Sequence, residues 1–355
     1  MRHPSLTLMQ LHKAFSPQVC AYTSASGAAQ MSYRWAVPGL TVTSAMTSAM
    51  TSAMTSGTTS ATTSTTTSTT TSSSTHVPAL SHVLMHGIGS GSASWVKQLQ
   101  WVSDQDAQTP QTPHTGAVLA WDAPGYGQST PLSDPEPSPQ DYGLAFWEWL
   151  DAFEASRDLV PFAQIEPLTL VGHSLGCLMA TAAVLARPER VKRLVLLAPA
   201  IGYGASSEAL RASKRDERLH NLQLLGPKGM ADKRGHAMLH EIRSSQTASE
   251  LAAFQELLEY VKHIMAQVTP SGYTQATHML ANADLLSLVG ALPCPLAVAS
   301  GDADVITPLA SCQTVAAAGH APHLVLSGSG HACHLQSAQA VIELLFNKSA
   351  VGQAA

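Results

Sequence analysis

The sequence contains few charged residues and no concentration of positive charge. Of its 355 residues only 12% are charged and 5% are aromatic, and the formal net charge is -5. No stretch combines several lysines or arginines with interleaved aromatic side chains, which is the pattern of many nucleic-acid-binding segments. Nothing would therefore supply the electrostatic attraction to phosphate on which such binding depends, and we expect no nucleic-acid partner.

Long hydrophobic runs are also missing. None approaches the roughly 20 apolar residues that a membrane-spanning helix needs, and the N-terminal segment MRHPSLTLMQLHKAF lacks the continuous apolar core of a secretory signal. We expect no membrane association and a cytoplasmic location. The five cysteines are odd in number and without CxxC spacing, which indicates a reducing compartment and no zinc or redox site; they are Cys20, Cys177, Cys294, Cys312 and Cys333.

Residues 43–75 form a low-complexity tract composed almost entirely of Thr, Ser, Ala and Met. Such a composition cannot bury enough apolar surface to offset the entropy lost on ordering, so we expect a disordered surface insertion. The preceding segment, residues 1–42, contains YRWAV near residues 33–37 and is a candidate for one early strand.

From His82 onward, short apolar runs alternate with longer amphipathic stretches. Runs that are apolar throughout suit strands buried on both faces, and intervening helices imply parallel crossovers. The pattern predicts an α/β fold with a mostly parallel central sheet flanked by helices on both sides. The runs are HVLMH, AVLAWD, LTLVGH, RLVLLAP, PLAVAS and HLVLS.

One region interrupts this alternation. Residues 201–269 are poor in strand-like runs and rich in helical charge spacing, which predicts a helical cap inserted into a core formed by residues 76–200 and 270–348. An insertion between two core strands would lie over the strand carboxyl ends, where open parallel sheets bind ligands.

A G-x-S-x-G pentapeptide centred on Ser174 joins the strand-like LTLV to a helix-prone run. A serine on such a tight strand-to-helix turn is strained, and the glycines at 172 and 176 let strand and helix approach without Cβ clashes. The hydroxyl and the amide that follows it would then face a pocket at a helix N-terminus, where negative charge is stabilised. We therefore predict that Ser174 is a nucleophile.

A second glycine-containing turn, HGIGS at residues 86–90, follows the first strong strand. A tetrahedral oxyanion needs at least two preorganised N–H donors, and the amides of Ile88 and Leu175 are the natural pair. Asp122 ends the next strand-like run, and we expect it to hold loop amides by hydrogen bonds.

A serine hydroxyl is a weak nucleophile near neutral pH, so a base and an orienting carboxylate are required. Both follow later strands: GDADVITP offers Asp302 or Asp304, and GSGHACH offers His331 or His334. We favour His331, because a loop residue after Gly-Ser-Gly can reach over the sheet edge, whereas His334 begins the last helical stretch. HACH has no partner ligands for a metal, and no cofactor is expected.

These motifs, taken in order, resemble those of the α/β-hydrolase superfamily of serine hydrolases, in particular bacterial enol-lactone and meta-cleavage product hydrolases. The resemblance spans about residues 77–348. In the family pattern the acid falls three residues after the glycine, which corresponds to Asp304, and the base corresponds to His331. The motifs that carry it are HGIGS, WDAPGYGQS, GHSLG, GDADVITP and GSGHACHLQ.

The resemblance implies hydrolysis of a small acyl substrate, an ester, lactone or thioester, through a Ser-His-Asp triad and an acyl-enzyme. Meta-cleavage product hydrolases usually carry tryptophan after the catalytic histidine, where this chain has Ala332, and this departure disfavours carbon–carbon bond hydrolysis. Three alternatives remain on the same scaffold: acyl transfer to an alcohol or amine, carbon–carbon bond hydrolysis, and ligand binding without catalysis. Substrate and oligomeric state are not readable from the sequence.

Overall fold

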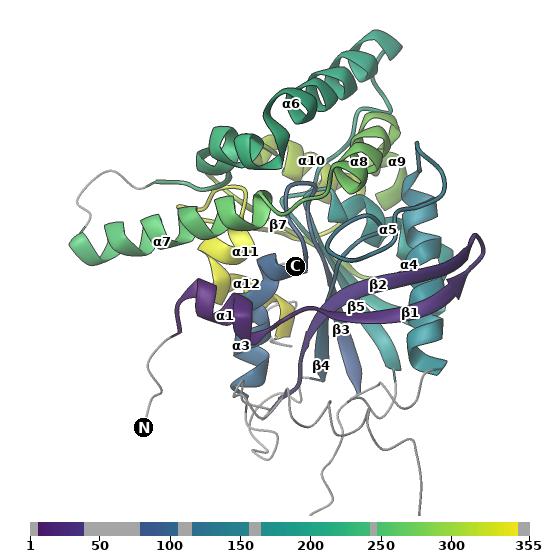
Figure 1. The fold of residues 1–355 in the computed structure, drawn as a ribbon, viewed down its shortest axis with the longest axis horizontal. Helices are drawn as coiled ribbons and strands as arrows, with labels where there is room; N and C mark the ends of the chain where they lie inside the picture. The colour runs from purple at the N-terminus through teal and green to yellow at the C-terminus, as the bar shows by residue number, and fades with distance from the viewer. Residues whose placement is uncertain (1–5, 39–78, 106–115, 156–164, 242–246, 347–355) are drawn as a thin grey trace, which may run out of the picture.

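The computed structural model describes residues 6–38, 79–105, 116–155, 165–241 and 247–346 (Figure 1). The Ser/Thr/Ala/Met tract at 43–75 lies outside these residues, so its expected disorder stays a prediction.

The described residues form one eight-stranded sheet with the order β1-β2-β4-β3-β5-β6-β7-β8. β1 and β2 pair antiparallel, β2 pairs antiparallel with β4, and all later neighbours are parallel. Each of the six apolar runs of the sequence contributes to one strand from β3 to β8. The strands are β1 Gln18–Ser24, β2 Gly27–Ala36, β3 Leu80–Met85, β4 Ala117–Trp121, β5 Ile165–His173, β6 Val191–Leu197, β7 Leu296–Gly301 and β8 His323–Leu326.

Alternate residues of the central strands enter two separate cores, which explains why these strands are apolar throughout. In β6, Leu194 and Leu196 pack into one core, whereas Val195 and Leu197 pack into the other. α4 Pro139–Ala155, α5 Gly176–Ala186, α9 Leu285–Val289 and α10 Leu309–Ala318 cover the first face, and α1 Leu8–Ala14, α3 Val96–Ser103 and α12 Ala338–Phe346 cover the second (Figure 1). The predicted α/β fold is confirmed.

Between β6 and β7 the chain forms the helical insertion, drawn in green in Figure 1. Its first helix, α6 Glu208–Arg234, is bent at Gly226, which has φ 61° and ψ 176°, and Pro227 restarts the helix. Glycine reaches this left-handed backbone region without a Cβ penalty, and proline suits the first turn of a helix. The insertion continues through η3 Gly235–Met238, α7 Ala248–Met265 and α8 Pro270–Asn282.

The N-terminal segment is tied to this insertion. The amide of Leu8, at the start of α1, donates a hydrogen bond to Glu256 Oε1 of α7 at 2.7 Å. The buried guanidinium of Arg34 in β2 donates to the carbonyl oxygens of His12 in α1 and of Phe15 just after it. Residues 33–36 of the YRWAV stretch belong to β2, and the structure adds β1, a strand that the apolar-run pattern does not predict.

Candidate functional site

Ser174 lies on the turn between β5 and α5 and has φ 54°, a left-handed conformation that is strained for a side chain other than glycine. The neighbouring glycines are required by close approach. A Cβ on Gly172 would lie 2.6 Å from the Cα of Cys177, and a Cβ on Gly176 would lie 2.5 Å from the carbonyl oxygen of Met85. The strand, the turn and the helix therefore have the geometry that the pentapeptide predicts.

His331 and Asp304 form a buried pair. Nδ1 of His331 lies 2.8 Å from Oδ2 of Asp304, and the other carboxylate oxygen accepts from the amides of Ile306 at 2.7 Å and Thr307 at 3.0 Å. Burial pushes the pKa of Asp304 upward, but its hydrogen bonds with His331 and Thr307 outweigh burial and leave the pKa below its ordinary value. Asp304 is therefore ionised at neutral pH and accepts the Nδ1 proton, which leaves Nε2 of His331 as the basic atom.

The two residues that the sequence leaves as competitors have other partners. Asp302 is exposed and its carboxylate accepts from the amide of Gly328 at 2.8 Å and the hydroxyl of Ser327 at 3.2 Å, so it holds the turn after β8. His334 is buried with its ring 4.3 Å from that of His173, and neither of its nitrogens has a hydrogen-bond partner among the described residues. Only Asp304 pairs with His331.

Ser174 and His331 line one cavity of about 320 Å³ between the carboxyl end of the sheet and the helical insertion. Ser174 is only 6% exposed, and in the described part of the chain its hydroxyl makes no hydrogen bond to His331. Such contacts are often long in ligand-free enzymes and tighten when substrate binds. The pair His331–Asp304 is thus formed, while the serine shares the cavity without yet being bonded to the histidine.

The two amides predicted to hold an oxyanion belong to the same cavity. Leu175 precedes α5 directly, and Ile88 lies in the loop after β3; neither amide donates a hydrogen bond within the described residues. His86 fixes that loop, because its Nδ1 lies 2.9 Å from the carbonyl oxygen of Gly87 and its Nε2 accepts from the amide of Ala123 at 3.1 Å. The amide of Leu175 therefore lies where the N-terminus of α5 adds positive potential.

Two further residues support the pair, and the sequence gives little signal for either. The hydroxyl of Thr307 lies 2.7 Å from Asp304 Oδ2 and 3.2 Å from His331 Nδ1. In the sequence, an Asp followed three residues later by Thr is only a weak signal for a turn. His173 places its Nε2 2.9 Å from the carbonyl oxygen of His331, a contact between residues 158 apart in the chain that no local pattern reveals.

Asp122 behaves as expected. One of its carboxylate oxygens accepts from the amide of Ser92 at 2.6 Å, and the other accepts from the hydroxyl of Ser32 at 2.7 Å. It joins two loops and β2 and does not line the cavity of Ser174, so its predicted structural role is confirmed.

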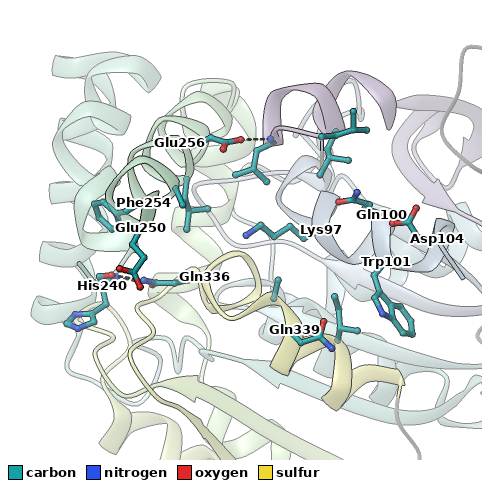
Figure 2. A pocket seen from close by; sticks show the side chains of 17 residues that line it. Lys97, Gln100, Trp101, Asp104, His240, Glu250, Phe254, Glu256, Gln336 and Gln339 are labelled. Carbon is teal, nitrogen blue, oxygen red and sulfur yellow. Dashed lines mark hydrogen bonds between the residues drawn. The ribbon is translucent and has the colours of Figure 1, made fainter. Parts of the chain in front are cut away.

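A larger hollow of about 760 Å³ lies elsewhere, between α1, α3, α7 and α12 (Figure 2). Its wall contains Lys97, whose side-chain nitrogen donates to the carbonyl oxygen of Leu335 at 2.7 Å. The hydrogen bond between Leu8 and Glu256 lies along one side of the hollow. Of the residues predicted for chemistry, none lines this hollow. The candidate site is therefore the smaller cavity.

The remaining expectations concern thiols, metals and membranes. All five cysteines are free thiols. Within the described ranges, no three His, Cys, Asp or Glu side chains gather in a way that could hold a metal ion, and no described helix is both long and apolar enough to cross a membrane. The cytoplasmic location stays a prediction.

Comparison with known proteins places the chain in a family. The model of the Alpha/beta hydrolase family matches residues 83–344. An (E)-2-((N-methylformamido)methylene)succinate hydrolase from Acinetobacter baylyi is 28% identical over 265 residues, which cover 73% of this chain and 86% of that protein.

Two solved structures share the fold. A thermophilic esterase from Thermogutta terrifontis superimposes with a TM-score of 0.65 at 16% identity, over 92% of this chain and 96% of the esterase. The enol-lactonase from Burkholderia xenovorans gives 0.64 at 17% identity, over 92% and 98% of the two chains. The chain therefore belongs to the alpha/beta hydrolase family, as its motifs predict.

Proposed function

We propose that this protein is a serine hydrolase that cleaves a carboxylic ester, lactone or thioester through an acyl-enzyme. One observation carries the proposal: the strained Ser174 lines a cavity together with a histidine whose Nδ1 is held by an ionised, buried aspartate. This is the arrangement in which a serine hydroxyl can lose its proton at neutral pH. The relative from Acinetobacter baylyi, named as a hydrolase, supports the same reaction class.

In the first step, Nε2 of His331 takes the hydroxyl proton of Ser174 while Oγ attacks the substrate carbonyl carbon. The carbonyl π bond opens, and the resulting oxyanion is held by the amides of Ile88 and Leu175. Asp304 keeps the imidazole in the reactive tautomer and stabilises the imidazolium that forms. Collapse of the intermediate breaks the bond to the leaving group, which takes its proton from His331.

In the second step, water attacks the acyl-enzyme. His331 removes a proton from the water, the same two amides hold the second oxyanion, and Ser174 leaves with the proton returned by the histidine. The residues supply acid, base and oxyanion stabilisation, so the mechanism requires no cofactor.

The residue after the base favours this chemistry over carbon–carbon bond hydrolysis. Ala332 is buried and its amide donates to the carbonyl oxygen of Met238 in η3 at 2.7 Å. Because Ala332 is buried, the larger indole of the tryptophan usual in meta-cleavage product hydrolases would fit here only if neighbouring residues moved.

A panel of p-nitrophenyl acyl esters of increasing chain length tests the proposal. We expect turnover by the full-length protein and a loss of at least about 1,000-fold in kcat for Ser174→Ala, whose far-UV and near-UV circular dichroism should be unchanged. Full activity of Ser174→Ala would contradict the proposal. Turnover in the presence of competing alcohols and amines separates hydrolysis from transfer, because a transferase would acylate one acceptor far beyond its concentration relative to water.

A further inference from the structure

The cavity that contains Ser174 carries positive charge without any negative charge. Its lining includes two arginines, Arg218 and Arg234, and no aspartate or glutamate, and most of the other side chains that line it are apolar. Since cationic groups on an apolar wall attract anions strongly, the charge of these two residues bears on the substrate.

Both arginines belong to α6, and they differ from most of the other basic residues of that helix. Arg211, Lys214, Arg215 and Lys228 each form an ion pair with an acidic residue of the same helix, at distances up to 3.9 Å. Arg218 and Arg234, in contrast, form no ion pair with the described part of the chain. Lys233 also lacks a carboxylate partner among the described residues, but it donates to Asn221 Oδ1 at 3.0 Å and does not line the cavity, whereas Arg218 and Arg234 do.

The guanidinium of Arg218 is held in place but not satisfied. Its carbon lies 5.8 Å from the ring centre of Tyr203, another cavity residue, which is within cation–π range. Its Nε is closed to solvent and has no hydrogen-bond partner among the described residues, and its terminal nitrogen reaches only the carbonyl oxygen of Lys214 at 3.5 Å. Because no carboxylate of the described residues pairs with this guanidinium, its terminal N–H groups are the donors left for a ligand in the cavity.

The bend at Gly226 explains how both arginines reach one cavity. They are 16 positions apart, so a straight helix would separate them by about 24 Å along its axis. Because α6 turns at Gly226 and Pro227, one arm contributes Arg218 and the other contributes Arg234. The insertion is thus shaped so that two cations converge.

We propose that Arg218 and Arg234 form a carboxylate-binding subsite, so that the substrate is a small acyl compound that carries a free carboxylate besides its scissile carbonyl. A guanidinium donates two parallel hydrogen bonds to a carboxylate, and the paired charges compensate for lost hydration. A cavity of about 320 Å³ is at the small end for ligand sites, which suits a short dicarboxylate half-ester better than a lipid. The assignment rests on the hydrolase function proposed above.

Matched substrates test the subsite. Mono-p-nitrophenyl glutarate carries a carboxylate where p-nitrophenyl pentanoate ends in a methyl group, so the ratio of their kcat/KM values isolates the charge. We expect the full-length protein to favour the glutarate at least about tenfold. Arg218→Met and Arg234→Met should each lower that ratio about tenfold, mainly through KM, and the lysine variants should restore part of it. Arg215→Met, which removes a paired arginine from the same helix, should leave the ratio unchanged.

Binding to the Ser174→Ala protein separates this proposal from the proposed function. Calorimetry with glutarate should detect binding to the Ser174→Ala protein, and adding either arginine substitution should abolish that binding. If glutarate binds in this way but the unmodified protein hydrolyses no ester, the hydrolase function is overturned and the subsite is kept. Equal turnover of both esters, with no glutarate binding, would overturn the subsite and keep the hydrolase. Tighter binding of inorganic phosphate than of glutarate would contradict a carboxylate as the anion.

Discussion

The carboxylate that orients His331 is decided by contacts that only the folded chain brings together. Asp302 and Asp304 are two residues apart on one loop, yet Asp304 bonds to the imidazole whereas Asp302 bonds to the turn that contains Ser327 and Gly328. The strained turn of Ser174, the candidate nucleophile, could be predicted from its local pattern, because strand, glycines and helix are contiguous in sequence. The acid could be assigned only through the family resemblance, because its partner lies 27 positions away.

Replacing each carboxylate by an amide makes this difference measurable. Asp304→Asn keeps the shape but favours the wrong imidazole tautomer, so we expect kcat on an activated ester to fall by roughly 10⁴-fold. Asp302→Asn, the matched control, weakens only the turn after β8 and should stay within about twofold of the parent. Steady-state kinetics on both variants decides, and equal losses would mean that the acid is wrongly assigned.

At the scale of elements, the strands buried on both faces could be predicted and the edge strand could not. β6 is apolar throughout because alternate residues fill two cores, and this is visible in sequence. β1 lies at the sheet edge with most of its side chains partly or fully exposed, so it leaves no apolar run. The convergence of Arg218 and Arg234 was likewise hidden, because it depends on how the two arms of α6 lie over the core.

The bend in α6 predicts the effect of a single methyl group. Gly226 occupies a backbone region that is almost closed to other residues, so Gly226→Ala should lower the free energy of unfolding by about 1–3 kcal/mol or straighten α6. Gly290→Ala is the control: Gly290 has helical angles and its Cβ would lie 3.8 Å from the nearest backbone atom, so little change is expected. Urea denaturation measures both, and equal stability of the two variants would contradict the strained bend.

At the scale of the whole molecule, buried neutral histidines should make stability depend on pH. Burial lowers the pKa of His82 to about 3 and that of His173 to about 3, against 6.5 in the unfolded chain. Between pH 6.5 and 3 the unfolded state therefore binds more protons, and stability falls as pH falls. The stabilisation from Asp304 is lost only below its ordinary value of 3.8, because its folded pKa is lower still.

For each such histidine the free energy of unfolding should drop by about 2 kcal/mol between pH 7.5 and pH 5. Urea unfolding curves at the two pH values measure the drop, and His82→Gln should reduce it by the share of one histidine. The same urea midpoint of unfolding at pH 7.5 and pH 5 would show that the fold does not hold these imidazoles neutral.

The Ser/Thr/Ala/Met tract should be dispensable. Ala36 at the end of β2 pairs with Val118, and Leu80 at the start of β3 pairs with Ala117. Both chain ends therefore lie beside the start of β4, separated by two strand spacings or about 10 Å. Deleting residues 43–75 leaves residues 37–42 and 76–79, which reach about 33 Å when extended and can close this gap. We expect the same thermal midpoint and kcat/KM within about twofold; a folded but inactive deletion variant would assign the tract a functional role.

The central claim is that Ser174 is a nucleophile activated by His331, and fluorophosphonate labelling followed by peptide mapping tests it most directly. The account predicts one modified peptide that contains Ser174, slower labelling in Asp304→Asn and no labelling in Ser174→Ala. Label on another cavity serine such as Ser311, or no label on folded protein, would contradict it.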